Sequence, residues 1–205
     1  FYIMLSCINI GLELNNKTVL KSLTLSLLPG SIYVLKGANG SGKTSLLQIL
    51  AGLKSPTEGN LLWNNKAIDY ELYHKNIVSY LGHEIAIKKD LSVFDNLLLW
   101  SKLKSSELLL NPAISHFQLT EMEDIQCKYL SAGWQKRVAL ARMIISNTQL
   151  WLLDEPEANL DEKGMELLLQ LLQAKIASGG MAIIASHNQS YYNKIPIINV
   201  EDYKT

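Results

Sequence analysis

The chain has 205 residues, enough for one large domain or two small ones with a substantial core. Hydrophobic residues make up 48% and charged residues 19%, a composition that excludes a disordered chain. Nineteen basic residues balance 19 acidic ones, so the long-range attraction of a nucleic-acid binder is not expected. No run of 18 apolar residues predicts a membrane span. The start lacks the pattern of a signal peptide, and the two cysteines lack the spacing of a zinc site or a disulfide framework, which predicts a reduced, cytosolic chain.

Strands of two kinds are predicted along the chain. Apolar and polar residues alternate over residues 23–27, which is typical of a half-buried strand, and residues 5–10 and 61–63 are predicted as further strands. The last of these precedes a predicted Asn64-Asn65 turn. Runs that are apolar almost throughout are predicted to be strands buried on both faces of a parallel sheet; they are residues 32–35, 150–153 and 181–185.

Helical patterns separate those strands, at residues 43–50, 138–145 and 163–176. Alternation of helices with buried strands predicts an α/β fold with a parallel central sheet. The middle segment, residues 91–129, contains no convincing strand and several helical patches, such as residues 93–103. It is therefore predicted to be a helical insertion in the α/β core.

A glycine-rich loop follows the first buried strand. Residues 37–44 read GANGSGKT and fit the pattern G-x-x-x-x-G-K-S/T. Glycines let the backbone curl so that successive N–H groups face the β- and γ-phosphates, and the next helix presents its N-terminus to the same anion. Lys43 adds a charge to those oxygens, and the Thr44 hydroxyl is predicted to complete a Mg²⁺ shell. The predicted phosphate-binding residues are Gly37, Ala38, Asn39, Gly40, Ser41, Gly42, Lys43, Thr44 and Ser45.

Two carboxylates, Asp154 and Glu155, end the second buried strand. The carboxyl ends of parallel strands form the edge where such folds bind ligands. Asp154 is predicted to hold Mg²⁺ directly or through water, and Glu155 to polarise a water for in-line attack on the γ-phosphate. An Asp-Glu pair standing alone is often a solvated acidic turn. Together with the glycine-rich loop, the pair predicts binding of ATP, or another nucleoside triphosphate, with magnesium.

A third motif separates the remaining classes, because a kinase, a recombinase or a GTPase also carries the first two. Residues 130–137 read LSAGWQKR and precede a helical pattern. Here the sequence resembles the ATP-binding cassette (ABC) ATPases, whose signature reads L-S-G-G-Q, with departures at Ala132 and Trp134. The resemblance implies that Ser131 and Gly133 cap the γ-phosphate held by an opposite subunit, with Lys43, Glu155 and His187 as catalytic residues.

The other landmarks of this family occur in order, from Leu5 to about His187. Residues 158–161 resemble its dimer-contacting segment. His187 resembles the switch histidine, which reaches the γ-phosphate and orients the attacking water. Residues 91–97, LSVFDNL, resemble the stretch L-T-x-x-E-N-L, and this alignment puts His83 where the family places a glutamine that joins the metal site to the transporter contact.

His83 is accordingly an expected metal-site residue, together with Thr44 and Asp154; a neutral imidazole can bridge a water or a metal shell, but unlike glutamine it titrates near neutrality. The aromatic residue that stacks on adenine in the family falls near Leu14, which offers apolar contact without a ring.

The sequence resembles one subfamily in particular, the ATP-binding subunits of cytochrome c maturation haem exporters, or CcmA type. The features that it shares with them are Y-L-G-H at residues 80–83, the signature segment and the short chain. The resemblance implies a P-loop NTPase fold with a RecA-like parallel sheet core and an N-terminal antiparallel β subdomain, over residues 1–82 and 140–205. A helical subdomain that includes the signature is expected over residues 84–139.

The same resemblance implies an ATPase with ATP and Mg²⁺ as cofactors, which forms a homodimer when it binds ATP. Its expected partner is a transmembrane transporter subunit, which alone contacts the membrane, so the chain is expected to be peripheral on the cytoplasmic face of the inner membrane. Neither haem nor nucleic acid is an expected ligand.

Other functions stay open at this point. One is the ATPase subunit of another small ABC exporter, for a drug, a lipid or a lipoprotein; another is a P-loop phosphotransferase. A DNA-maintenance ATPase of the coiled-coil ABC kind would carry long coiled-coil arms, with heptad repeats, between the glycine-rich loop and the signature. No such repeats occur in the sequence.

Overall fold

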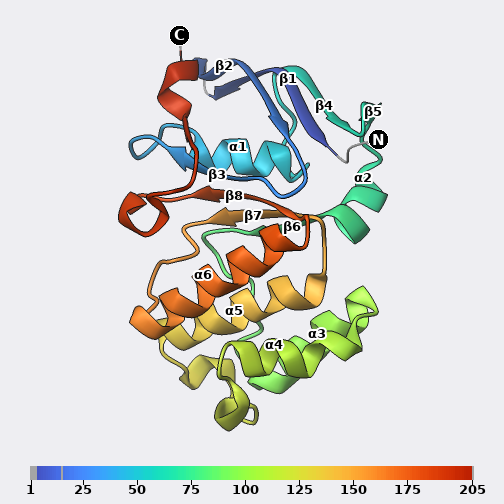
Figure 1. The fold of residues 1–205 in the computed structure, drawn as a ribbon, viewed down its shortest axis with the longest axis vertical. Helices are drawn as coiled ribbons and strands as arrows, with labels where there is room; N and C mark the ends of the chain where they lie inside the picture. The colour runs from blue at the N-terminus through green and yellow to red at the C-terminus, as the bar shows by residue number, and fades with distance from the viewer. Residues whose placement is uncertain (1–3, 15, 205) are drawn as a thin grey trace. The chain divides into compact units, whose positions relative to one another are not determined.

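The computed structural model of the chain describes residues 4–14 and 16–204. The chain forms two compact units (Figure 1). The first comprises residues up to 80 with residues 149–155 and those from 175 onward, and the second comprises residues 81–148 and 156–174. The expected subdomain boundary between residues 139 and 140 falls inside a helix, α5 (Ala132–Ser146), which belongs to the second unit as a whole.

An antiparallel sheet forms one part of the first unit, as expected from the resemblance. Its strands are β1 (Leu5–Leu14), β2 (Lys17–Leu27), β4 (Glu58–Trp63) and β5 (Lys66–Ala67), in the order β2-β1-β4-β5. Asn64 and Asn65 have φ angles of 52° and 60°, the left-handed values of a two-residue type I′ turn, and they join β4 to β5. The structure therefore confirms the turn predicted at these asparagines.

A mostly buried parallel sheet forms the other part. Its strands are β6 (Val78–Leu81), β7 (Leu150–Asp154), β8 (Met181–Ala185), β3 (Ile32–Lys36) and β9 (Ile197–Asn199), in the order β6-β7-β8-β3-β9. The pairs β3–β8, β3–β9 and β7–β8 are parallel. Every residue of β7 and β8 is buried, which confirms the prediction made from their apolar runs. The short strands β6 and β9 were not predicted, because neither carries an unbroken apolar run like those of β7 and β8.

Helix α1 (Lys43–Leu50) lies between the two sheets of this unit (Figure 1). It contacts β7 and β8, and its apolar residues at 46, 47, 49 and 50 are fully buried in the core that the sheets share. A short helix, α2 (Tyr70–Leu72), and a π-helical turn (Tyr73–Ile77) lead from the antiparallel sheet to β6. The Tyr73 hydroxyl donates a 2.8 Å hydrogen bond to the carbonyl of Leu50 at the end of α1.

The second unit is helical. Helices α3 (Val93–Lys104) and α4 (Leu110–His116) both contact α5, and most of α6 (Glu162–Ala177) belongs to the same unit. Residues 91–129 form α3, α4 and short 3-10 turns at Glu107–Leu109, Thr120–Met122 and Cys127–Tyr129, which confirms the predicted helical insertion. Another 3-10 turn, Gln189–Tyr192, follows β8 in the first unit. Among the described residues, no helix is long and apolar enough to cross a membrane.

The buried hydroxyl of Tyr73 gives a test of how the first unit is stabilised. Tyr73→Phe removes the donor and leaves the buried carbonyl of Leu50 without this bond, so we expect the free energy of unfolding to fall by about 1 kcal/mol. Tyr129→Phe, at an exposed ring in the second unit, is the matched control and is expected to change it little. Denaturant titration of both variants measures the difference, and equal stabilities would contradict this assignment.

Candidate functional site

The glycine-rich loop connects β3 to α1 in the way the sequence predicts. Gly42 precedes the first residue of α1 with a φ of 102°, and a Cβ atom there would lie 2.6 Å from the Val19 side chain of β2. Glycine is thus required both by the left-handed backbone and by the close approach of β2. The loop curls back over the start of α1, and the Lys43 ammonium donates to the carbonyls of Gly37 at 2.7 Å and Ala38 at 3.1 Å.

The two carboxylates at the end of β7, Asp154 and Glu155, lie beside this loop. The Thr44 hydroxyl, in the first turn of α1, donates a 2.8 Å hydrogen bond to Oδ2 of Asp154. Burial lowers the pKa of Lys43, and the negative charges of Glu155 and Asp154 oppose that shift. The structure therefore brings the predicted phosphate-binding lysine and the two predicted metal-binding oxygens of the first unit together.

Glu155 and His187 form the second contact of this site. His187 follows β8, and its Nε2 lies 2.9 Å from Oε1 of Glu155. Glu155 has a left-handed backbone with φ of 47°, and its N–H donates to the carbonyl of Ala185 at the end of β8. Such a conformation costs energy for a residue other than glycine and is common at functional sites. Two of the three predicted catalytic side chains, Glu155 and His187, thus meet at the carboxyl edge of the parallel sheet.

These residues line one hollow of about 370 Å³ in the first unit. Leu14, which was predicted to contact the base, and Val19 form its aliphatic side. The other lining residues are Asn39, Gly40, Ser41, Gly42, Lys43, Thr44, Ser45, Asp154, Glu155 and His187. Val19 was not predicted to line the site, because a valine on a strand resembles any other core residue. The chemical roles assigned to all these residues stay predictions.

One further residue that contacts the glycine-rich loop, Glu201, was not predicted from the sequence. Glu201, in the 3-10 turn Val200–Tyr203, accepts a 3.1 Å hydrogen bond from the N–H of Ala38. The two residues are 163 positions apart, and Glu201 belongs to no recognised motif, so no local pattern pointed to it.

The signature segment lies in the second unit, at the start of α5. Ser131 is the N-cap, and its hydroxyl accepts a 3.4 Å hydrogen bond from the N–H of Trp134. A Cβ atom at Gly133 would lie 2.7 Å from the carbonyl oxygen of Asn159, so only glycine allows the segment before α6 to pass this close. A hollow of about 350 Å³ opens here; its lining residues are Ser131, Ala132, Gly133, Trp134, Arg137, Asn159 and Asp161.

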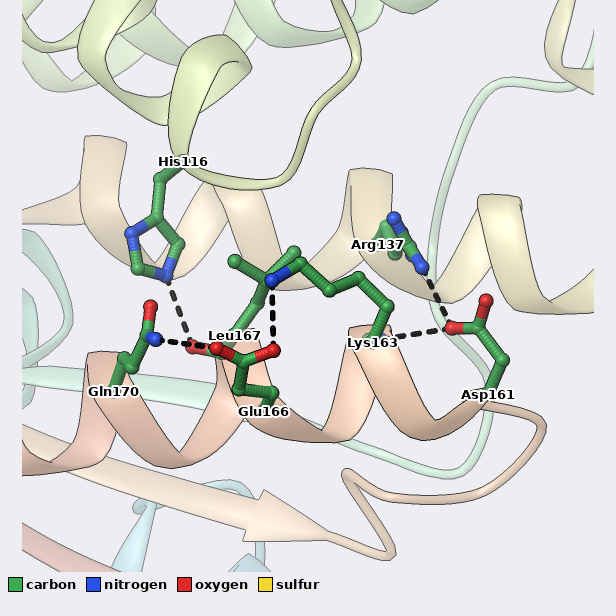
Figure 2. A network of polar contacts seen from close by, with 8 residues as sticks. His116, Arg137, Asp161, Lys163, Glu166, Leu167 and Gln170 are labelled. Atoms are coloured by element: carbon green, nitrogen blue, oxygen red, sulfur yellow. Dashed lines mark hydrogen bonds and ion pairs between the residues drawn. The ribbon is translucent and has the colours of Figure 1, made fainter.

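An ion pair connects α5 to the start of α6. Nη2 of Arg137 lies 2.6 Å from Oδ1 of Asp161, and the same oxygen accepts the N–H of Gly164 (Figure 2). The Arg137 side chain is 4% exposed, and its guanidinium lies 4.4 Å from the centre of the Trp134 ring. The departure from the family signature at Trp134 therefore supplies a face on which the buried arginine stacks.

Farther along α6, Figure 2 shows a second group of contacts. Glu166 accepts from Lys163 at 2.7 Å and from Gln170 at 3.0 Å, and Nε2 of His116 lies 3.0 Å from the carbonyl of Leu167. The His116 contact joins α4 to α6, and the two bonds of Glu166 lie within α6.

His83 lies in the second unit and is exposed. It lines a hollow of about 540 Å³ with the following loop and the first turns of α5, and Arg142 of α5 donates to two carbonyls of that loop, Ile85 at 2.6 Å and Ala86 at 2.9 Å. Within the part of the chain that the structure describes, no group of three or more His, Cys, Asp or Glu residues forms a metal site. The part of His83 at a metal stays a prediction.

Proteins of a known family are similar to this chain along most of its length. Residues 20–158 match a family model described as ABC transporter. A protein of Rickettsia bellii is 38% identical, with 96% of this chain and all of that protein covered, and one of Haemophilus influenzae is 36% identical, with 98% and 96% covered. Both carry the name cytochrome c biogenesis ATP-binding export protein CcmA.

Solved structures agree on the fold. A putative ABC transporter ATP-binding protein from Pyrococcus furiosus superposes with a TM-score of 0.84 at 23% identity, and the match covers 98% of this chain and 100% of that one. The dimeric ATP-binding cassette MJ0796, in a post-hydrolysis state bound to ADP and Pi, gives 0.80 at 22% identity, with 96% and 94% covered. The expected P-loop NTPase fold is confirmed.

The buried arginine gives a prediction about Asp161. Its hydrogen bond to Arg137, followed by the one from Gly164, holds the pKa of the Asp161 carboxyl below its ordinary value. Because that pKa is lower in the folded chain than in the unfolded one, the ionised carboxylate stabilises the fold at pH above about 4, and this contribution is lost as the pH falls through the folded value.

Arg137→Gln is therefore expected to raise the pKa of Asp161 toward its ordinary value, which carboxyl-carbon NMR titration measures. Lys163→Gln, on the neighbouring turn, is the control and is expected to leave that pKa in place, because Lys163 pairs with Glu166. An unchanged Asp161 pKa in Arg137→Gln would show that the ion pair does not hold the carboxylate.

Proposed function

The chain belongs to the ABC transporter family and, within it, to the CcmA group of cytochrome c biogenesis ATP-binding export proteins, and we propose that it hydrolyses ATP to drive a haem-exporter complex. The observation that carries the ATPase assignment is the first-unit hollow, in which the glycine-rich loop, Thr44 with Asp154, and Glu155 with His187 meet. The relatives match along almost their whole length, which supports the more specific assignment to cytochrome c biogenesis.

The residues of this hollow fit a nucleoside triphosphate with magnesium. Mg²⁺ prefers oxygen ligands and is usually held by one or two protein groups together with phosphates and waters. The Thr44 hydroxyl and the Asp154 carboxylate, 2.8 Å apart at the start of α1, are such a pair. When bound there, the ion would neutralise charge on the β- and γ-phosphates. Lys43 would turn from the loop carbonyls to the same phosphates.

Glu155 and His187 suit the hydrolytic step. We expect the Glu155 carboxylate to accept the proton of a water as its oxygen bonds to the γ-phosphorus and the bond to the ADP oxygen breaks. His187 contacts the same carboxylate at 2.9 Å, so it would hold Glu155 and the water in line with the γ-phosphate. Leu14 and Val19 would receive the base by apolar contact.

A second copy of the chain would complete the nucleotide site. The glycine-rich loop covers one side of the γ-phosphate, and Ser131 and Gly133 at the N-terminus of α5 form an anion-binding helix start of the kind that would cover the other. The MJ0796 structure, a dimer with ADP and Pi, is a solved precedent for an assembly of two such chains. ATP would then join two copies, and hydrolysis would release them.

A transmembrane subunit is the remaining partner, and the chain would be peripheral on the cytoplasmic face of the membrane. The second unit exposes large apolar side chains around α3: Leu103 is 65% and Leu108 is 94% exposed. Exposed apolar groups of this kind favour a protein partner over open solvent. Nothing in the chain's own chemistry points to haem, so the membrane partner would choose the cargo.

The dimer gives a direct prediction. Glu155→Gln keeps the shape of the side chain and removes the base, so we expect ATP hydrolysis to fall roughly a hundredfold or more and an ATP-bound dimer to accumulate. Gel filtration with ATP and magnesium measures the dimer, and phosphate release measures turnover. Glu121→Gln, at an exposed glutamate of the helical insertion, is the control and should behave like the wild type. A Glu155→Gln chain that stays monomeric with ATP and magnesium would contradict the proposed dimer.

A further inference from the structure

The last strand and turn of the first unit lie against the glycine-rich loop. β9 pairs in parallel with β3, with Lys36 opposite Asn199, so the two strands end side by side. β3 continues into the loop, and β9 continues into the 3-10 turn that carries Glu201. Val200 is fully buried in the core, and the Asn199 side chain caps the turn by accepting the N–H of Glu201 at 3.3 Å. The backbone of Glu201 is therefore fixed beside the loop by the sheet and the core.

Glu201 contacts the peptide group that joins Gly37 to Ala38. The N–H of Ala38 donates to Oε1 of Glu201 at 3.1 Å, and the carbonyl of the same peptide group, that of Gly37, accepts from the Lys43 ammonium at 2.7 Å. Because a peptide group is planar and trans, its N–H and C=O point in opposite directions. Glu201 and Lys43 thus hold this peptide from its two sides, and rotation of the peptide would break both contacts at once.

The charge of Glu201 is partly balanced. Nζ of Lys204 lies 3.8 Å from Oε1 of Glu201, and the two residues have opposite effects on the pKa of Lys43, which Glu201 raises and Lys204 lowers. A carboxylate beside a loop that binds a polyphosphate repels its ligand, so attraction cannot be the reason for an acid at this position. The Glu201 side chain instead contributes a hydrogen-bond acceptor for the Ala38 N–H, supplied by the C-terminal turn and not by the loop itself.

We propose that Glu201 is a positioning residue of the phosphate-binding loop, which fixes the Gly37–Ala38 peptide so that the loop keeps the geometry that receives the nucleotide's phosphates. The inference rests on the proposed binding of ATP and extends the nucleotide site to the C-terminal turn. The two properties of the Glu201 carboxylate then have opposite effects: its hydrogen bond favours nucleotide binding, and its negative charge opposes nucleotide binding.

Three substitutions distinguish these properties. Glu201→Gln keeps an oxygen acceptor of the same reach and removes the charge; Glu201→Ala removes both; Glu201→Asp keeps the charge and shortens the reach by one methylene. The side chain is 44% exposed, so all three are expected to fold, which their thermal unfolding midpoints check. Asp202→Asn is the control: it removes a charge from the same turn, at a side chain that accepts a hydrogen bond from the Asn199 amide and does not contact the loop peptide.

The measurements are the dissociation constant of a fluorescent ATP analogue with magnesium, and KM and kcat for ATP. We expect Glu201→Ala and Glu201→Asp to raise the dissociation constant and KM roughly three- to tenfold, the worth of one hydrogen bond, with kcat within about twofold of the wild type. Glu201→Gln is expected to bind as tightly as the wild type or more tightly, and Asp202→Asn like the wild type.

Equal dissociation constants for Glu201→Gln and Glu201→Ala would overturn the inference, because both variants lack the charge and differ in the acceptor. A loss of kcat with unchanged KM in Glu201→Ala would overturn it too, since it would place the effect on hydrolysis. Failure of the proposed function has a different signature: the wild-type chain would then show no saturable binding of the analogue that Lys43→Ala abolishes.

Discussion

The hydrogen bond between Thr44 and Asp154 is the contact on which the candidate site depends. It joins the first turn of α1 to the end of β7, 110 residues apart, and it forms because β3, β8 and β7 are neighbours in one parallel sheet. With their carboxyl ends at the same edge, β3 supplies the glycine-rich loop, β7 the two carboxylates and β8 the histidine. A single edge of the sheet therefore gathers the groups that the proposed binding and hydrolysis of ATP require.

The second unit supplies a different kind of site. Its signature segment departs from the family sequence at Ala132 and Trp134, yet Ser131 still caps α5 and Gly133 still allows the carbonyl of Asn159 to pass. The Trp134 ring lies against Arg137, which also pairs with Asp161 at the start of α6. The departures thus preserve the helix start that would face a second nucleotide, and dimer formation would use groups from both units of each chain.

Much of the fold could be predicted because its main elements carry strong local signals. Unbroken apolar runs identify β7 and β8, and α1 begins and ends where the glycine-rich loop and the apolar pattern place it. β6 and β9 carry no unbroken apolar run of that kind. Glu201 and Val19 reach the loop only because segments distant in the sequence pair with one another. His83 was placed by alignment alone, and its role depends on geometry that no local pattern contains.

Complementation between two defective chains tests the central claim most directly. Lys43→Ala removes the phosphate-binding charge of one copy, and Ser131→Arg blocks the signature cap of another, so neither chain alone can build a shared site. An equal mixture contains pairs in which one intact loop faces one intact cap. The account predicts that the mixture forms an ATP-dependent dimer by light scattering, whereas each variant alone stays monomeric. A mixture as monomeric as its parents, or a Ser131→Arg chain that dimerises unaided, would contradict nucleotide binding between two copies.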